Sequence, residues 1–226
     1  MNNAVADRIK SFFSQFPVVR YKKGETILRA NDLPHWVYYL SKGNVRFYSL
    51  NEEGRELTFN IFKPGTYFPI VWMIGNEPNI YFFEAVTPIE LRRAPKEKVM
   101  EFIKADHEVL YELTQRLVRG LSGILVRMEY LMLTDAKRKI TSTILMLAKR
   151  FGEKKKESIL ITLPITHQGI ASLAGVTRET VSIEIKKLEK EGLIIKYGRL
   201  IAVTRIRKLK NESLMYLEND PLPYTF

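Results

Sequence analysis

The chain has 226 residues, 46% of them hydrophobic and 27% charged, which is typical of a globular protein with one large domain or two small ones. It contains no cysteine, and this excludes disulfides and cysteine-ligated iron–sulfur clusters and agrees with a reducing cytoplasm. No apolar run approaches the ~18 residues of a membrane span and no signal peptide is recognisable, so we expect a cytoplasmic protein with no membrane partner.

Catalytic signatures are missing as well. No P-loop, GxSxG or HExxH motif occurs in the sequence. The three histidines, His35, His107 and His167, are far apart and lack metal-ligand spacing, which predicts structural or exposed side chains and no metal site. We therefore expect that the protein is not an enzyme.

The first 95 residues change from a helical to a strand pattern. Residues 1–16 show apolar side chains at helical spacing, and Pro17 ends this amphipathic helix. From residue 18 to residue 95, short runs rich in aromatic and β-branched residues alternate with glycine-containing turns. The turn glycines are Gly24, Gly43, Gly54 and Gly65. Short strands at this spacing predict a small antiparallel barrel or roll.

A long helix is predicted over residues 106–133. Positions that step by four and three hold apolar residues in six of seven places, and Thr114 is the exception. The apolar positions are Leu110, Leu117, Leu121, Ile124, Met128 and Leu131. Three heptads are the lower limit of a coiled-coil signal, so the helix either pairs with a second copy of the chain or lies on its own domain. We favour the homodimer.

The last region begins with a predicted helix over residues 136–151 and a loop over residues 152–158, GEKKKES. The stretch that follows, ITHQGIASLAGVTRETVSIEIKKLEKEGLI, has the pattern of a helix–turn–helix. Thr166 and Thr177 are suited to cap its two helices, and Gly175 supplies the backbone freedom that the turn needs. LIIKYGRLIAV then predicts a β-hairpin wing.

The second helix of this motif has the features of a recognition helix. Its apolar stripe, Val181, Ile185 and Leu188, leaves the other face outward. The outward residues are Thr177, Arg178, Ser182 and Lys186, with Glu179 near the start of the helix. A recognition helix places its first residues against base edges in the major groove, where Arg reads guanine and Glu accepts from cytosine.

The charge distribution agrees with a polyanionic partner. Residues 135–226 carry 18 Lys and Arg against 10 Asp and Glu, whereas the first 134 residues carry 18 against 15. An excess of this kind steers a protein toward nucleic acid. Lys186, Lys187 and Lys190, together with Lys196 and Arg199 of the hairpin, are expected to meet phosphates. Duplex DNA is therefore the predicted partner.

The order of roll, long helix and winged helix–turn–helix resembles the cyclic-AMP receptor protein/FNR superfamily of bacterial transcription regulators. The resemblance runs from about residue 16 to residue 209, and it is most specific in the helix–turn–helix and in the glycine turns KKGETIL, SKGNVRFY, EEGREL and KPGTYF. It implies an α+β fold with an antiparallel jelly roll like that of cyclic-nucleotide-binding domains, a long dimerisation helix and a winged helix–turn–helix. The corresponding domains are 1–105, 106–134 and 135–226.

The resemblance also implies roles for individual residues. It implies a homodimer on a roughly palindromic operator, with RNA polymerase as a candidate partner. Arg178 and Glu179 match the family's base-reading pair, and Ser182 and Ile183 complete the predicted reading set. The residues that match backbone, flanking or wing contacts are Thr166, Gln168, Thr177, Lys186, Tyr197 and Arg199.

Ile183 departs from the family pattern, because many members carry a second base-reading arginine at this place. Isoleucine has no hydrogen-bond donor, although it can contact a thymine methyl group. Alternatively, it packs beside its neighbours and leaves the reading to Arg178 and Glu179. We expect an altered or relaxed preference at the corresponding base pair.

The predicted effector region departs further. Pro69-Ile70 and Asn79-Ile80 stand where members that bind cyclic nucleotides have Gly-Glu and Arg-Ser, and Ile124-Leu125 replaces a Thr-Ser pair. A buried phosphate without arginine lacks its charge-assisted partner, so cyclic AMP is not expected. A haem held by a histidine is the remaining cofactor alternative, but no residue in the sequence indicates one. The segment is aromatic instead, and Phe68, Trp72, Tyr81 and Phe83, with Ile124 and Leu125, either line a pocket for an apolar effector or fill the roll.

Three classes of function therefore compete. The leading interpretation is a sequence-specific transcription regulator, with or without an effector. The second is a small-molecule sensor whose helix–turn–helix contacts protein, which the basic excess disfavours. The third, an enzyme, lacks a nucleophile, base or metal constellation.

Overall fold

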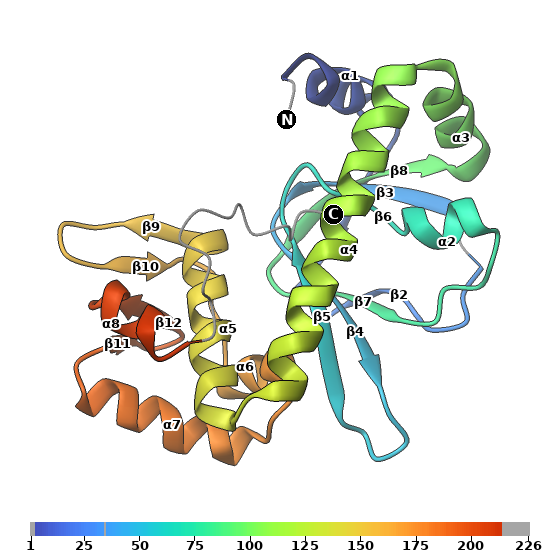
Figure 1. Cartoon of the computed structure of the whole chain (residues 1–226). Helices are drawn as coiled ribbons and strands as arrows, with labels where there is room; N and C mark the ends of the chain where they lie inside the picture. Colours follow the sequence, from blue (N-terminus) through green and yellow to red (C-terminus); the bar gives the residue numbers. More distant parts are fainter. Residues whose placement is uncertain (1–2, 34, 214–226) are drawn as a thin grey trace. The chain divides into compact units, whose positions relative to one another are not determined.

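The computed structural model describes residues 3–33 and 35–213, and the chain divides into two compact units (Figure 1). The boundary between them lies within the long helix α4 (His107–Leu133), between Ser122 and Gly123. The predicted split into three domains, with a separate dimerisation segment, stays a prediction.

The first unit is built on two four-stranded antiparallel sheets, which confirms the predicted roll. One sheet has the order β1-β8-β3-β6 and the other the order β2-β7-β4-β5. The strands of the first sheet are β1 (Val18–Tyr21), β8 (Ile89–Pro95), β3 (Trp36–Lys42) and β6 (Tyr67–Phe68). Those of the second are β2 (Thr26–Leu28), β7 (Phe82–Ala85), β4 (Val45–Leu50) and β5 (Glu56–Phe62).

One apolar core lies between these two sheets. The inward side chains of both sheets form a single cluster, in which Leu40 and Leu91 come from the first sheet and Val45 and Phe83 from the second. The turn between β3 and β4 depends on Gly43, whose φ of +80° favours glycine. A Cβ at this position would also lie 2.3 Å from the carbonyl oxygen of Pro88, so no other residue fits there without a backbone shift.

Helices cover one end of the roll. α1 (Asn3–Ser14), α3 (Lys96–Ala105) and the first part of α4 pack together in a second apolar cluster, which includes Phe13, Ile103 and Leu113. The predicted N-terminal helix is thus confirmed. A short helix, α2 (Ile70–Gly75), lies in the predicted effector segment, where the sequence pattern indicated no helix.

The second unit combines four helices with a four-stranded antiparallel sheet of order β11-β12-β10-β9. Its helices after α4 are α5 (Ala136–Phe151), α6 (His167–Ala174), α7 (Arg178–Lys190) and α8 (Ile206–Asn211). Its strands are β9 (Gly152–Lys154), β10 (Ile159–Ile161), β11 (Ile194–Tyr197) and β12 (Leu200–Val203). The predicted helices and the wing hairpin β11–β12 are confirmed.

The prediction of a simple loop over residues 152–158 was wrong in its first half. Residues 152–154 form β9, which pairs with β10 so that Gly152 lies opposite Ile161. Thr162 closes this hairpin against the end of α5, because both its amide and its hydroxyl donate to the carbonyl oxygen of Phe151. Lysine-rich composition indicated a solvated loop, but backbone pairing needs no apolar side chain.

No helix in the described ranges is long and apolar enough to cross a membrane. Within the same ranges, no cluster of three or more His, Asp or Glu side chains is arranged to hold a metal ion.

Candidate nucleic-acid interface

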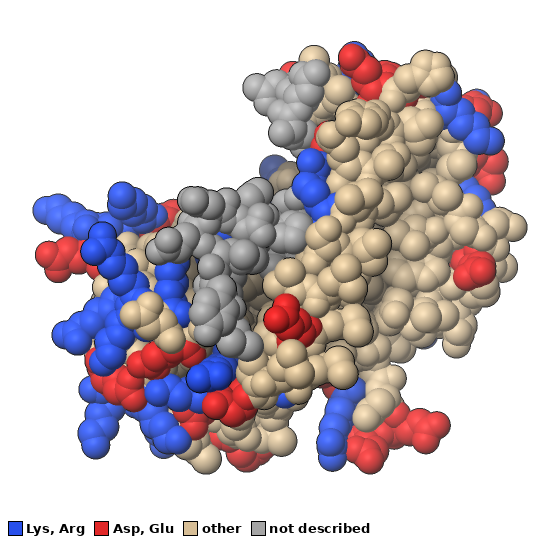
Figure 2. All heavy atoms as spheres, viewed as in Figure 1, with Lys and Arg blue, Asp and Glu red and all other residues tan. Residues whose placement is uncertain are grey.

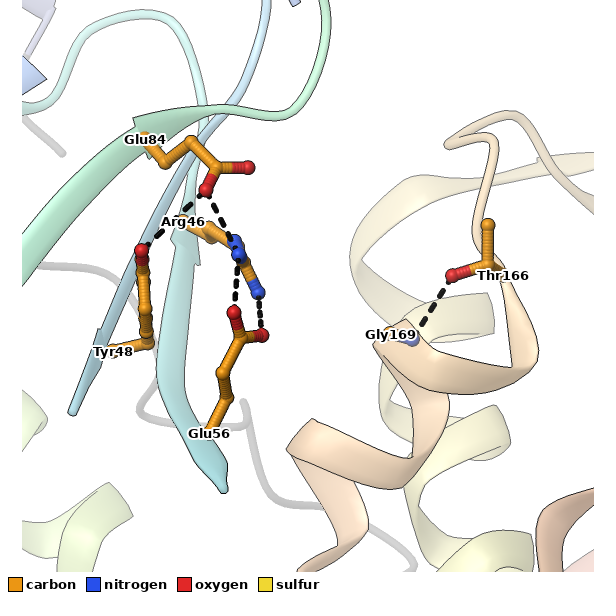
Figure 3. A network of polar contacts seen from close by, with 6 residues as sticks. All are labelled: Arg46, Tyr48, Glu56, Glu84, Thr166 and Gly169. Atoms are coloured by element: carbon orange, nitrogen blue, oxygen red, sulfur yellow. Dashed lines mark hydrogen bonds and ion pairs between the residues drawn. The ribbon is translucent and has the colours of Figure 1, made fainter. Parts of the chain in front are cut away.

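The two helices of the helix–turn–helix begin at the predicted caps. Thr166 precedes α6, and its hydroxyl accepts from the amide of Gly169 at 3.0 Å (Figure 3). Thr177 precedes α7 and accepts from the amide of Thr180 at 3.2 Å. Between them Gly175 has a φ of +63°, the left-handed conformation that ends α6. These caps satisfy backbone donors that have no partner within the helices, and so they fix where α7 starts.

The buried side of α7 orients its other face. Val181, Ile185 and Leu188 are fully buried, as predicted. Arg178, Glu179 and Lys186 are exposed, as is Gln168 on α6. Two side chains of opposite charge and with free polar ends therefore stand in the first turn of the predicted reading helix.

Ile183 is also outward, with 55% of its surface exposed. The alternative that it packs among its neighbours is not favoured by this exposure. The exposed side chain is accessible for an apolar contact to a base, as predicted from the sequence.

Ser182 differs from the expectation of an outward side chain, because it is half-buried and hydrogen-bonded within the protein. Its hydroxyl donates to the carbonyl oxygen of Arg178 at 3.0 Å and lies 2.8 Å from Nδ1 of His167. Nε2 of the same imidazole lies 3.0 Å from Nζ of Lys196 on the wing. His167 therefore links α6, α7 and β11, a position that its isolation in the sequence did not indicate.

The wing carries the remaining predicted contacts. Tyr197 and Arg199 are exposed at the turn between β11 and β12, where Gly198 has a φ of +62°. The carbonyl oxygen of Arg199 accepts from the amide of Ile165 at 2.9 Å, which ties the wing turn to the segment before α6. The predicted backbone-contacting residues Thr166, Gln168, Tyr197 and Arg199 thus belong to neighbouring segments of one unit.

The surface charge of this unit is mixed but rich in cations. Figure 2 shows Lys and Arg side chains gathered over α7, the β9–β10 hairpin and α8, with acidic side chains between them. Some of these cations are paired: Lys187 with Glu184, Lys155 with Glu153, and Lys137 with Glu191 and Glu212. The cations at the start of α7 and on the wing turn are exposed, as an approach to phosphates requires.

The long helix is joined to the helix–turn–helix by a buried cation. Arg127, in the part of α4 that belongs to the second unit, donates from Nη2 to the carbonyl oxygen of Leu173 at 2.6 Å. Leu173 lies in the last turn of α6, where a positive charge is favoured by the helix dipole. In the first unit Arg116 of α4 similarly donates to the carbonyl oxygen of Gly65, and it pairs with Glu112 at 3.1 Å.

An exposed apolar stripe runs along α4. Of the predicted seam, Leu110, Leu121, Ile124 and Met128 are exposed, whereas Leu117 and Leu131 are half-buried. Leu117 packs against the helical cluster of the first unit instead. A second set of residues at heptad spacing is exposed throughout. It shares Thr114, Leu121 and Met128 with the predicted seam and otherwise uses the residue that follows each predicted position. The set is Tyr111, Thr114, Val118, Leu121, Leu125, Met128 and Met132.

The aromatic residues of the predicted effector pocket form a stacked cluster in the roll. Phe68 and Phe83 are buried and stacked with ring centroids 5.0 Å apart, and Trp72 and Tyr81 contact Phe47 edge to face beside them. Ile124 and Leu125 are exposed on the part of α4 that belongs to the second unit. A pocket for an apolar effector stays a prediction, as does the alternative that the rings only fill the roll.

Asn79 occupies the place where the resemblance led us to look for a phosphate-binding arginine. Its side chain is fully buried, donates to the carbonyl oxygens of Arg29 and Tyr81, and accepts from the amide of Tyr81. These hydrogen bonds hold the loop of Asn79 in shape and tie it to the segment that follows β2. The side-chain amide is thus engaged within the protein, where a phosphate site would need an outward donor.

A half-buried cation of the roll is also engaged within the protein. Arg46 of β4 is bound by Glu56 and Glu84 of the two neighbouring strands, and its guanidinium lies over the ring of Tyr48 (Figure 3). The distance from Nη2 to Glu84 is 2.8 Å. This network connects three strands and leaves no net positive charge there for an anionic ligand.

Comparison with known proteins agrees with this architecture. Residues 18–106 match the family model of the cyclic nucleotide-binding domain, and residues 138–212 match that of the Crp-like helix-turn-helix domain. The chain is 31% identical over 194 residues to a global nitrogen regulator of Nostoc sp., covering 83% of this chain and 85% of that protein. It is 32% identical over 186 residues to the transcriptional regulator SdrP of Thermus thermophilus, covering 80% and 87%.

A solved structure also matches this chain over most of its length. A transcriptional regulator of the CRP/FNR family from Thermus thermophilus superposes with a TM-score of 0.71 at 29% identity, covering 87% of this chain and 97% of that one. Its fold agrees with the roll, the long helix and the winged helix–turn–helix described above. The chain belongs to the Crp/Fnr family of DNA-binding transcription regulators.

Proposed function

We propose that this regulator acts as a homodimer on a roughly two-fold-symmetric operator, in the cytoplasm. The observation that carries the proposal is the exposed Arg178–Glu179 pair at the capped start of α7. Arg can donate two hydrogen bonds to guanine O6 and N7, and Glu can accept from cytosine N4, so the pair is suited to one G·C base pair in each half-site. Lys186 and Arg199, exposed on α7 and the wing, are assigned to phosphates.

The dimer is assigned to the exposed stripe of α4. Side chains such as Val118, Leu121 and Leu125 are 58% exposed and repeat at heptad spacing. A parallel partner helix would remove them from water, and a two-fold axis along α4 would place two recognition helices on one face of the duplex. This seam replaces the one predicted from sequence at Leu117 and Leu131.

Any effector of this regulator is assigned to a class of ligand other than the cyclic nucleotides. A relative from Pasteurella multocida with 27% identity is named as cAMP-activated. In the present chain, however, the Asn79 side chain is engaged by the backbone carbonyls of Arg29 and Tyr81, and Arg46 is neutralised by two glutamates. A cyclic phosphate would therefore find no free cation at these two places.

The test is selection of random duplex DNA by the purified protein at near-physiological salt, with nothing added. We expect enrichment of a two-fold-symmetric site, with a G·C pair that is no longer selected by Arg178→Ala. The same selection with cyclic AMP or cyclic GMP should return an unchanged site and an unchanged affinity. Salt-sensitive binding with no enriched site would contradict the assignment of α7 as the reading helix.

The selection also tests the role of Ile183. We expect a thymine, recognised through its methyl group, at the base pair opposite Ile183. Ile183→Arg should shift the preference there toward guanine. An unchanged site in that variant would mean that position 183 does not contact a base.

A further inference from the structure

One histidine of the three lies within the proposed DNA interface. His167 is the first residue of α6, and its imidazole reaches two other elements at once. Nδ1 lies 2.8 Å from the hydroxyl oxygen of Ser182 on α7, and Nε2 lies 3.0 Å from Nζ of Lys196 on β11. The side chain is half-buried, so both contacts are partly shielded from water.

The chemistry of the partners fixes the proton on the ring. An ammonium group can only donate, so Nε2 must be the unprotonated nitrogen that accepts from Lys196. Nδ1 then carries the proton and donates to the Ser182 hydroxyl, which in turn donates to the carbonyl oxygen of Arg178 at 3.0 Å. The series of hydrogen bonds thus runs from Lys196 on the wing through His167 and Ser182 to the first turn of the recognition helix, with one donor and one acceptor in each bond.

We propose that His167 is a positioning residue of the DNA interface, which in its neutral form joins the wing to the recognition helix through Lys196 and Ser182. The inference rests on the proposed function, because it takes Lys196 as a phosphate contact. The ammonium of Lys196 uses one N–H for His167 and keeps two for phosphate oxygens. A lysine that is already restrained loses less side-chain freedom when DNA binds, and this preorganisation favours affinity.

The surroundings of His167 favour the neutral ring. Its pKa lies below the usual value because of burial first and then because of the positive charge of Lys196. Arg178 and Lys186 of α7 act in the same direction, and Glu189 of α7 acts against them. The ring is thus held in the form that can accept from an ammonium group at neutral pH.

The first experiment reads the ring directly, without DNA. In nitrogen-detected NMR of the full-length protein at pH 7.5, we expect Nδ1 of His167 to be protonated and Nε2 to be bare. Lys196→Met, which keeps the aliphatic stem and removes the charge, should raise the pKa of His167 and release the ring toward the Nε2–H form. An Nε2–H ring in the unsubstituted protein, or a pKa that Lys196→Met leaves unchanged, would overturn the proposal.

The second experiment is a double-mutant cycle on the selected duplex. His167→Phe should weaken binding about three- to tenfold, which is the scale of one side chain that is no longer preorganised. In the Lys196→Met background the same substitution should have no further effect, because the group on which it acts is gone. Additive losses would mean that His167 does not act through Lys196.

Two variants complete the design. His167→Gln retains an acceptor for Lys196 and should recover part of the affinity that is lost in His167→Phe. Such a recovery would show that the loss in His167→Phe is not caused by misfolding. His107→Phe, an exposed histidine at the start of α4, is the matched control and should bind as the unsubstituted protein does. An Nε2–H ring in the NMR experiment would overturn only the positioning role of His167. Absence of duplex binding by the unsubstituted protein would instead overturn the proposed function.

Discussion

Val118→Glu tests the proposed dimer seam, because it places a carboxylate in the middle of the apolar stripe of α4. Val118 is 58% exposed, so a partner helix would bury about half of a valine side chain in each protomer. That burial contributes on the order of 1 kcal/mol per protomer, or ~2 kcal/mol per dimer. Two desolvated carboxylates that face each other across the axis add a penalty of about 1–3 kcal/mol. A total of about 3–5 kcal/mol raises the dissociation constant of the dimer by about 10²- to 4 × 10³-fold.

Equilibrium sedimentation across a range of protein concentrations measures this constant. Ser122→Glu is the flanking comparison, because Ser122 is exposed one helical turn after Val118 and its hydroxyl donates to the carbonyl oxygen of Val118. It should weaken the dimer less than Val118→Glu does, and neither variant should alter the melting of the roll, since both side chains are exposed. A Val118→Glu dimer as tight as the unsubstituted one would refute the seam.

Three further predictions concern the second unit. Arg178→Ala should cost about 1–3 kcal/mol on the selected duplex and much less on random duplex, as measured by titrating both. Gly152→Ala should lower the free energy of unfolding by about 1–3 kcal/mol in urea titration, because its Cβ would lie 2.0 Å from the carbonyl oxygen of Ala148. Gly75→Ala is the control and should leave the free energy of unfolding nearly unchanged, because its Cβ would meet nothing within 4 Å and its φ is not positive. Burial lowers the pKa of His167 in the folded protein, so the neutral ring contributes fully to stability above the unfolded pKa of about 6.5. This contribution is lost as the pH falls through the lower pKa of the folded state. The melting temperature of the unsubstituted protein should therefore drop more over this pH range than that of His167→Gln.

The parts of the fold that local chemistry determines were predictable from the sequence. The glycine turns of the roll, the caps Thr166 and Thr177, and the left-handed Gly175 each follow from one residue and its immediate neighbours. The buried stripe of α7 follows from the helical period alone. These features needed no knowledge of what packs against them.

Features that depend on tertiary contacts were missed for the same reason. The heptad pattern of α4 is compatible with two seams that share Leu121 and Met128, and the packing of Leu117 on the helical cluster removes that residue from an outward stripe. The bridging position of His167 needs α6, α7 and β11 to be placed together, although Ser182 and Lys196 are 15 and 29 residues away. From the sequence, Asn79 could only be noted as a residue that stands in place of an expected arginine. The structure shows that its amide donates to the carbonyl oxygens of Arg29 and Tyr81.

These contacts narrow what the recognition helix can read. Ser182 uses its only proton on the carbonyl oxygen of Arg178, so it has no donor left for a base. Ile183 is exposed but has no polar atom, and its only means of base recognition is a methyl contact. We therefore expect directional hydrogen bonding to base edges to come from Arg178 and Glu179. We expect an operator in which each half-site is sharply defined at one G·C pair, biased toward thymine beside it, and otherwise recognised through the backbone and the shape of the duplex.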